Sequence, residues 1–223
     1  MGYKVFVDFE MAPIPYSVRK EKGISGCEII QIGAVILDNE NKEVGEFKRN
    51  IRPLFIGELP NKYVRLLGLT YDDLAYNCKI EEGLDDFADW IYSFSDDFMV
   101  YAWSNNDLSQ LNHEIMIKDI NLNEKYYNIL GSWFDLQEEY DHLVGAKENT
   151  GLKRALETCG IEFEGKEHDS LFDSRNTSRL YIEMRNPEEL LETINKTKKY
   201  TQKKADYTTS LGDIFDFSKL IIA

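Results

Sequence analysis

The chain has 223 residues, of which 43% are hydrophobic and 30% charged, a balance typical of a globular domain that buries a large core. Its net charge of −14 argues against tight, processive holding of a nucleic-acid duplex, which usually needs a basic face. No apolar run approaches the ~18 residues of a membrane span, no signal peptide is expected, and the three scattered cysteines suit a reducing cytoplasm.

The first predicted strand, residues 3–10, carries two carboxylates. Asp8 and Glu10 are two positions apart, so they point to the same face, and the apolar Val7 and Phe9 alternate with them. Two carboxylates held together repel each other unless a cation lies between them, and Mg²⁺ is a hard cation that takes oxygen ligands. The pair fits equally well with two solvated acids at the end of an edge strand.

Two further strands, 28–38 and 43–52, are predicted next, with a turn-rich hairpin between them. Pro53 ends the second of these strands because proline cannot continue the hydrogen-bond ladder. Helices are expected at 60–67 and 81–94, the latter with apolar residues at helical spacing.

Asp107 lies between a predicted strand, 97–103, and a predicted helix, 107–117. In an α/β sheet, ligands bind at the carboxyl ends of the strands, which is the position of this junction. The alternative is an ordinary acid in the first turn of a helix, where the helix dipole favours negative charge.

A fifth strand is predicted at 127–134, followed by short helices at 135–143 and 150–159. Hairpin strands at the start, followed by strand–helix alternation, predict an α/β fold with a mixed five-stranded sheet and helices on both faces.

His168 precedes the next predicted helix, which runs to about residue 185, and Asp173 lies a little over one turn further on. The histidine is therefore expected on a loop or first turn, with the carboxylate directed inward from the helix. The alternative is that Asp169 caps the helix, Asp173 lies on the surface and His168 is an ordinary loop residue.

The C-terminal part is predicted to be an appendage, which divides the chain into 1–187 and 188–223. Pro187 opens a helix at 188–204, as an N1 proline would. The apolar segment that follows, 205–223, is expected to pack on the domain, on a second copy of the chain or on a protein partner.

Two basic clusters stand out in this acidic chain. One is Arg19, Lys20 and Lys22, after the first strand, and the other is a group of lysines between 196 and 204. Each is interpreted as a solvated face rather than a binding patch, as isolated charge runs usually are.

Taken together, the segments VFVDFEM, YAWSNNDLSQL and HDSLFDSRN resemble the DEDDh group of 3′–5′ exonucleases, which are proofreading-exonuclease-like members of the RNase H-like superfamily. The resemblance covers about residues 3–185. The opening DFEMAP and the segment AWSNNDLSQL are most similar to the branch of small-RNA and histone-RNA trimming exoribonucleases. Further landmarks of the family are similar to CEIIQIGAVILD (27–38), LGLT (67–70), WFDL (133–136) and GLK (151–153).

The resemblance implies a metal-dependent enzyme that releases nucleoside monophosphates from the 3′ ends of single-stranded RNA or DNA. It implies two Mg²⁺ or Mn²⁺ ions as cofactors. Asp8 would bridge both ions, Glu10 and Asp173 would hold the ion that carries the attacking water, and Asp107 would hold the second ion.

The resemblance also implies roles for two other residues. His168 would accept the proton of the attacking water, as an imidazole that titrates near neutral pH can. Met11, the residue after the acidic pair, would contact the terminal nucleotide, although a core methionine fits the position equally well.

Two other classes of function stay open. One is a proofreading subunit, in which the acidic surface and residues 188–223 bind a polymerase. The other is a non-catalytic nucleic-acid-binding scaffold with the same fold, but none of the five key residues is lost.

Overall fold

The structure is a computed structural model that describes residues 2–24 and 26–197. The predictions for the apolar segment 205–223, and for the second half of the helix before it, lie outside the described residues.

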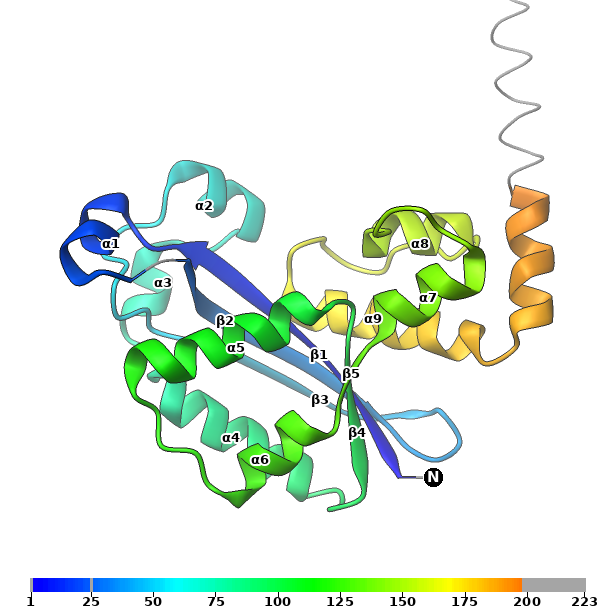
Figure 1. The fold of residues 1–223 in the computed structure, drawn as a ribbon, viewed down its shortest axis with the longest axis horizontal. Helices are drawn as coiled ribbons and strands as arrows, with labels where there is room; N and C mark the ends of the chain where they lie inside the picture. The colour runs from blue at the N-terminus through cyan, green and yellow to red at the C-terminus, as the bar shows by residue number, and fades with distance from the viewer. Residues whose placement is uncertain (1, 25, 198–223) are drawn as a thin grey trace, which may run out of the picture.

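A mixed five-stranded sheet forms the centre of the molecule, in the order β3-β2-β1-β4-β5 (Figure 1). β1 pairs antiparallel with β2, which pairs antiparallel with β3, whereas β1–β4 and β4–β5 are parallel. The strands are β1 (Tyr3–Pro13), β2 (Cys27–Leu37), β3 (Glu43–Asn50), β4 (Phe98–Ala102) and β5 (Trp133–Asp135). The predicted fold class is thereby confirmed.

Nine named helices connect and flank these strands in the described part of the chain. They are α1 (Tyr16–Lys22), α2 (Asn61–Leu67), α3 (Tyr71–Ala75), α4 (Ile80–Tyr92), α5 (Asn105–Lys118), α6 (Glu124–Gly131), α7 (Leu136–Val144), α8 (Leu152–Thr158) and α9 (Ser170–Met184). None of the helices within the described ranges is both long and apolar enough to cross a membrane.

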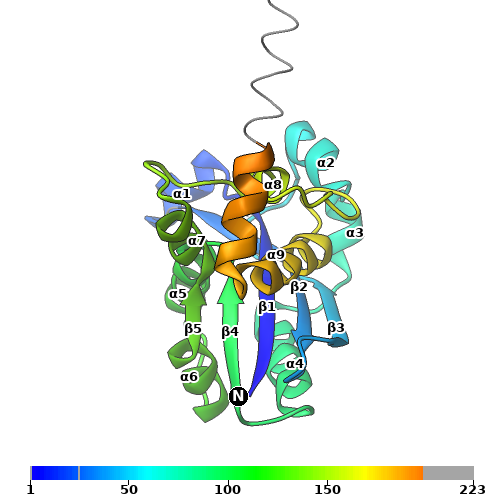
Figure 2. The same cartoon turned by 90° about the vertical axis from the view of Figure 1, so that its right-hand side faces the viewer.

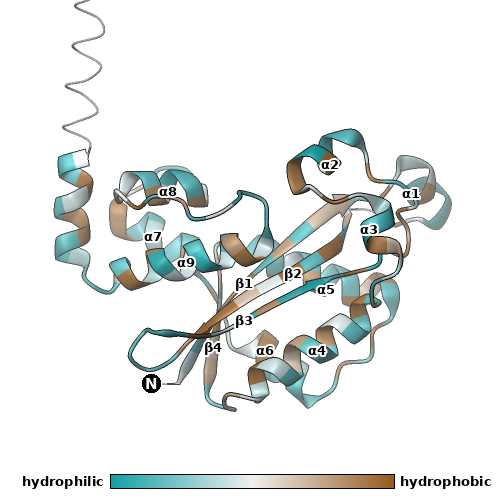
Figure 3. Ribbon diagram, turned by 180° about the vertical axis from the view of Figure 1, so that it is seen from behind, coloured by the Kyte–Doolittle hydropathy of each residue, from teal (hydrophilic) through white to brown (hydrophobic). Residues whose placement is uncertain are grey.

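The two faces of the sheet bury separate cores. One core contains Val5, Val7 and Phe9 of β1 and is covered by α4, α5 and α6. The other contains Phe6 of β1 and is covered by α7, α8 and α9 (Figure 2). β2 is buried along nearly its whole length, whereas the edge strand β3 is largely hydrophilic and buries only Phe47 (Figure 3). This burial follows from the sequences, because a strand covered on both faces reads as a continuous apolar run.

A third cluster packs α2 and α3 against the end of the sheet. Ala12 of β1 and Ile30 of β2 meet Leu67 of α2 and Leu74 of α3 there. Because Ala12 follows Glu10 by two residues, these helices lie beside the carboxylates of β1.

The predicted strand at 127–134 is wrong. Residues 124–131 form α6, and β5 is limited to Trp133–Asp135. Asn123 caps the helix by accepting hydrogen bonds from the N–H groups of Lys125 and Tyr126. Tyr126 and Ile129 then face the core three residues apart, as residues on one face of a helix do.

After α9 the chain turns into a further helix that includes 187–197 of the described residues. Leu190 and Ile194 are buried in the same core as α7, α8 and α9. This helix therefore contributes to the hydrophobic core of the domain.

Candidate active site

The carboxylates of β1 lie in its second half, where the strand still pairs with β2 but its pairing with β4 has ended at Phe6. Glu10 is buried and Asp8 is half-buried, while Val7 and Phe9 point into the opposite core. A β-bulge follows between Glu10 and Met11 and changes the register with β2. The alternation predicted for this strand therefore places both carboxylates on one face.

Asp107 comes from the first turn of α5 and is buried. Ser104 caps the helix by accepting a hydrogen bond from the N–H of Asn106. The main-chain N–H of Phe9 donates to Asp107 Oδ1 at 3.0 Å, which fixes the carboxylate beside β1. This hydrogen bond joins Phe9 of β1 to Asp107 of α5 at the site, although the two residues are 98 positions apart in the chain.

A buried ion cluster anchors α5 on the sheet. Lys118 Nζ lies 2.7 Å from Glu28 Oε1 of β2 and 2.6 Å from Glu114 Oε2 on its own helix. Glu114 also accepts the N–H of Ile29 at 2.6 Å, and Glu28 accepts two N–H groups of the segment after β3. Buried charges are costly unless they are paired, so these ion pairs and hydrogen bonds hold the helix that carries Asp107 against the sheet.

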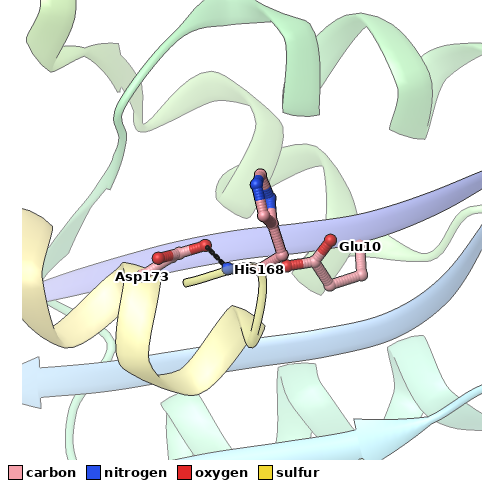
Figure 4. Close-up of side chains that lie close together, drawn as sticks. All are labelled: Glu10, His168 and Asp173. Carbon is pink, nitrogen blue, oxygen red and sulfur yellow. Dashed lines mark hydrogen bonds between the residues drawn. The ribbon is translucent and has the colours of Figure 1, made fainter. Parts of the chain in front are cut away.

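His168 and Asp173 approach β1 from the start of α9. His168 has a positive φ of 61°, uncommon outside glycine, and its N–H donates to Asp173 Oδ2 at 3.1 Å (Figure 4). Glu10, His168 and Asp173 each offer an atom that lies within 4.8 Å of the others. The structure therefore brings these three residues together from β1, a loop and α9.

Asp169 has a structural role. Its Oδ1 accepts the N–H of Leu171 at 3.2 Å and caps α9, and its Oδ2 pairs with Lys48 of β3 at 2.6 Å. The capping expected as an alternative for this segment is therefore found, but Asp173 and His168 still lie beside β1.

The start of α9 is held directly against β2. Gln31 Oε1 accepts both the N–H and the hydroxyl of Ser170, at 3.2 and 2.9 Å. Gly33 leaves no room between strand and helix, because a Cβ there would lie 2.2 Å from the main-chain carbon of Ser170. The QIG sequence thus sets the position of the loop that carries His168.

Gly33→Ala should therefore lower stability and displace α9. Its added methyl group meets backbone, which cannot move aside like a flexible side chain, and overpacking of this kind costs about 1–3 kcal/mol. Thermal unfolding should show the loss. Gly57→Ala is the matched control, because a Cβ at Gly57 meets nothing within 4 Å. Equal melting temperatures for the two variants would contradict the close contact.

Burial and mutual repulsion raise the pKa values of the clustered carboxyls. Burial, then repulsion from Asp107 and Asp173, raises the pKa of Asp8 well above its usual value. Burial is also the main cause that raises the pKa of Glu10 to about 8, and those of Asp107 and Asp173 to about 7. The nearby charge of Lys166 partly offsets the rise in the pKa of Glu10.

These four carboxyls fit divalent cations. Asp107 and Asp173 each accept one main-chain N–H, so the cluster holds more carboxylate oxygens than donors in the described residues. Hard oxygen ligands concentrated in this way match Mg²⁺ or Mn²⁺, and a bound cation removes the repulsion that raises the pKa values.

The metal-free protein should lose stability as pH rises from 5 to 8. Carboxyls with raised pKa values keep their protons in the folded chain and lose them in the unfolded chain. The folded chain then binds more protons, so the free energy of unfolding falls with pH, by on the order of a few kcal/mol in total. Urea unfolding in EDTA at pH 5, 6.5 and 8 measures this change. Mn²⁺ added at pH 8 in place of EDTA should restore the lost stability. A free energy of unfolding that rises from pH 5 to 8 in EDTA would contradict the raised pKa values.

Two hollows adjoin the carboxylates. One, of about 760 Å³, is lined by Asp8, His168 and Asp173 together with Trp103 and Arg154. Trp103 lies within the segment YAWSNNDLSQL and Arg154 follows GLK (151–153), but neither residue was among the predicted site residues. A larger depression of about 1040 Å³ at β5 and α7 holds none of the predicted site residues, and its lining is rich in acids.

The second hollow beside the site, of about 430 Å³, lies next to Glu10 and Asp107 along the chain. It is lined by Met11, Asn106 and Gln110 among others. Met11 is thus partly exposed at this hollow, while it also packs against the core that α4, α5 and α6 cover.

The model of the family described as "Exonuclease" matches residues 5–181. The chain belongs to this exonuclease family. ERI1 exoribonuclease 2 of Xenopus laevis is 29% identical over 203 residues, which cover 82% of this chain but only 28% of that protein. The probable 3′-5′ exonuclease KapD of Bacillus subtilis is 24% identical, with 87% and 85% coverage.

Solved structures agree with the exonuclease fold. The nuclease domain of 3′hExo, a DEDDh family member bound to rAMP, has a TM-score of 0.68 and 20% identity, covering 82% of this chain and 90% of that one. The predicted membership of an exonuclease family is confirmed by the family model. The part of the chain that matches the family model, residues 5–181, includes Asp8, Glu10, Asp107, His168 and Asp173.

Proposed function

We propose that the protein is a 3′–5′ exonuclease that releases nucleoside monophosphates from single-stranded RNA or DNA. The observation that carries this proposal is the convergence of Asp8, Glu10, Asp107 and Asp173 beside His168, in a chain of the exonuclease family. The chain spans well under half the length of the ERI1 relative that it matches, so its substrates are proposed from its own residues.

The four carboxylates would hold two divalent ions, Mg²⁺ or Mn²⁺, with Asp8 shared between them. When bound, such ions neutralise charge on the reacting phosphate and activate water. Among the described residues, Glu10, His168 and Asp173 form the one group of three potential metal ligands whose ligand atoms lie within 4.8 Å of one another.

His168 would accept the proton of the attacking water on a ring nitrogen. Its loop is fixed by the hydrogen bond from its own N–H to Asp173, so the imidazole starts from a defined position beside Glu10 (Figure 4). A positioned general base of this type contributes about 10²–10⁴-fold to a rate. Asp169 is a poor substitute, because its two oxygens already contact Lys48 and Leu171.

Met11 would contact the terminal nucleotide from the smaller hollow. The acidic net charge favours a single-stranded end over a duplex, because stacking and bound ions can then supply much of the affinity. A cytoplasmic location is proposed from three cysteines, Cys27, Cys78 and Cys159, all of which are free thiols. Residues 205–223 are proposed to pack on the domain or on a partner.

A time course on matched 5′-labelled single-stranded RNA and DNA tests the proposal. Products should shorten by one nucleotide at a time with Mn²⁺ or Mg²⁺, and cleavage should stop in EDTA or when the 3′ end is blocked. Cleavage in EDTA, or internal fragments from a 3′-blocked strand, would refute the proposal. Binding without any cleavage under these conditions would instead indicate a scaffold.

A further inference from the structure

Two short helices beside the site carry cations without acidic partners. α1 contains Arg19, Lys20 and Lys22 with one acid, Glu21, and the segment 59–71 around α2 contains Lys62 and Arg65 with no acid. We call α1 and α2 together the basic lobe.

None of the five cations of the basic lobe forms an ion pair with the described residues. Elsewhere in the described chain many cations are paired, such as Lys48 with Asp169, Arg49 with Asp86 and Arg175 with Glu43. Positive charge left unpaired in a chain of net charge −14 is available for an anionic ligand.

The lobe also exposes aromatic surface among its cations. Tyr16 is 71% exposed, with the Arg19 guanidinium 5.8 Å from its ring centre. Two further rings beside these cations are half-buried: Lys22 Nζ lies 5.9 Å from the ring centre of Phe55, just outside the lobe, and Lys62 Nζ lies 6.0 Å from that of Tyr63. Cations interleaved with aromatic rings are typical of surfaces that bind single-stranded nucleic acid.

The basic lobe adjoins the carboxylates. Leu67 of α2 packs in one cluster with Ala12, which lies about 7 Å beyond Glu10 along β1. Figures 1 and 3 both show α1 and α2 grouped at the end of the sheet where β1 finishes. The interpretation of the α1 cluster as an isolated solvated face is therefore incomplete, because the fold adds a second basic helix and the site.

Lys166 connects the lobe to the site. Its Nζ lies 2.5 Å from the position that a Cβ on Gly68 would take, so the ammonium group rests on the residue that ends α2. The same charge acts on Glu10. Arg154 also forms no ion pair with the described residues, and it lines the hollow of about 760 Å³ that His168 lines too.

We propose that the basic lobe binds the phosphodiester backbone of a single strand upstream of its 3′ end, and that Lys166 continues this path to the carboxylates. The inference rests on the proposed function and deepens it. An acidic chain repels a polyanion over most of its surface, so local cations near the site must hold the strand. Acids also flank α2 in the chain: Glu58 precedes it, and Asp72 and Asp73 start α3, where Asp73 is bonded to Thr70 in a capping box.

The test is the binding of a 5′-fluorescein-labelled 20-nucleotide strand, as RNA and as DNA, measured by anisotropy in EDTA from 50 to 200 mM KCl. The variant Lys20→Ala/Lys62→Ala/Arg65→Ala should bind at least about tenfold more weakly at 50 mM KCl. Its plot of log Kd against log salt should be shallower by about 2, because each lost phosphate contact contributes about 0.7 for single strands.

The matched control is Lys42→Ala/Lys125→Ala/Lys196→Ala, which removes the same charge from surfaces outside the lobe and should keep the wild-type slope. Thermal unfolding of both triple variants checks that each is folded. An unchanged Kd and slope in the lobe variant would overturn the inference and assign the lobe to another ligand, such as an acidic protein.

The assay separates this inference from the proposed function because it needs no turnover. A protein that shortens 3′ ends, but whose lobe variant binds like the wild type, refutes only the role of the lobe. A protein whose strand binding depends on the lobe, but which never cleaves, refutes only the exonuclease activity.

Discussion

Asp8→Asn should abolish turnover and weaken cation binding, yet raise the melting temperature of the metal-free protein. Asparagine keeps the shape of the side chain but removes one of four mutually repelling carboxylates. The electrostatic repulsion in the folded state is then lower when no cation is bound. The loss of activity should be at least as large as the roughly 10²–10⁴-fold expected for loss of a general base. Calorimetric titration with Mn²⁺, and unfolding in EDTA at pH 8, measure the two effects.

Asp96→Asn is the control for Asp8→Asn, because Asp96 is an exposed acid outside the site. It should leave turnover, Mn²⁺ affinity and melting temperature near the wild-type values. An Asp8→Asn variant that keeps near wild-type turnover, or that is less stable than wild type in EDTA at pH 8, would show that Asp8 is not part of a repelling cation site.

His168→Ala should slow the chemical step by about 10²–10⁴-fold while leaving Mn²⁺ affinity close to that of the wild type. The substitution removes the proton acceptor, but the four carboxylates and the main-chain N–H that Asp173 accepts all remain. Single-turnover rates at saturating Mn²⁺ give the loss of rate, and calorimetry gives the affinity. Added imidazole should recover part of the rate if a missing base is the cause.

His142→Ala is the matched control for His168, because His142 is an exposed histidine that lines the acidic depression at β5 and α7. It should turn over normally. If His168→Ala also turns over normally, a group other than His168 must accept the proton of the attacking water. If it instead loses Mn²⁺ affinity together with activity, His168 is a cation ligand, which its place within 4.8 Å of Glu10 and Asp173 also permits.

The sequence predicts those parts of the site that depend on local periodicity. Alternation along β1 places Asp8 and Glu10 on one face, and the strand–helix junction places Asp107 at the end of β4. In contrast, most of the strand predicted at 127–134 is helix α6, because the Asn123 cap and the burial of Tyr126 and Ile129 on one face select a helix.

The remaining contacts of the site join residues that are far apart in the chain, so no local pattern predicts them. Phe9 and Asp107 are separated by 98 residues, and Lys48 and Asp169 by 121. The basic lobe is a similar case, since α1 and α2 become one surface only when the sheet brings them to the same end. Charge runs therefore need the fold before a binding surface can be assigned to them.

The fate of the water oxygen tests the central claim most directly. A 3′-hydroxyl strand digested with Mn²⁺ in H₂¹⁸O should yield nucleoside 5′-monophosphates whose phosphate carries one ¹⁸O, as measured by mass spectrometry, because water attacks the terminal phosphodiester. Nucleoside 3′-phosphates, nucleoside diphosphates formed with inorganic phosphate, or monophosphates without the label would contradict the account.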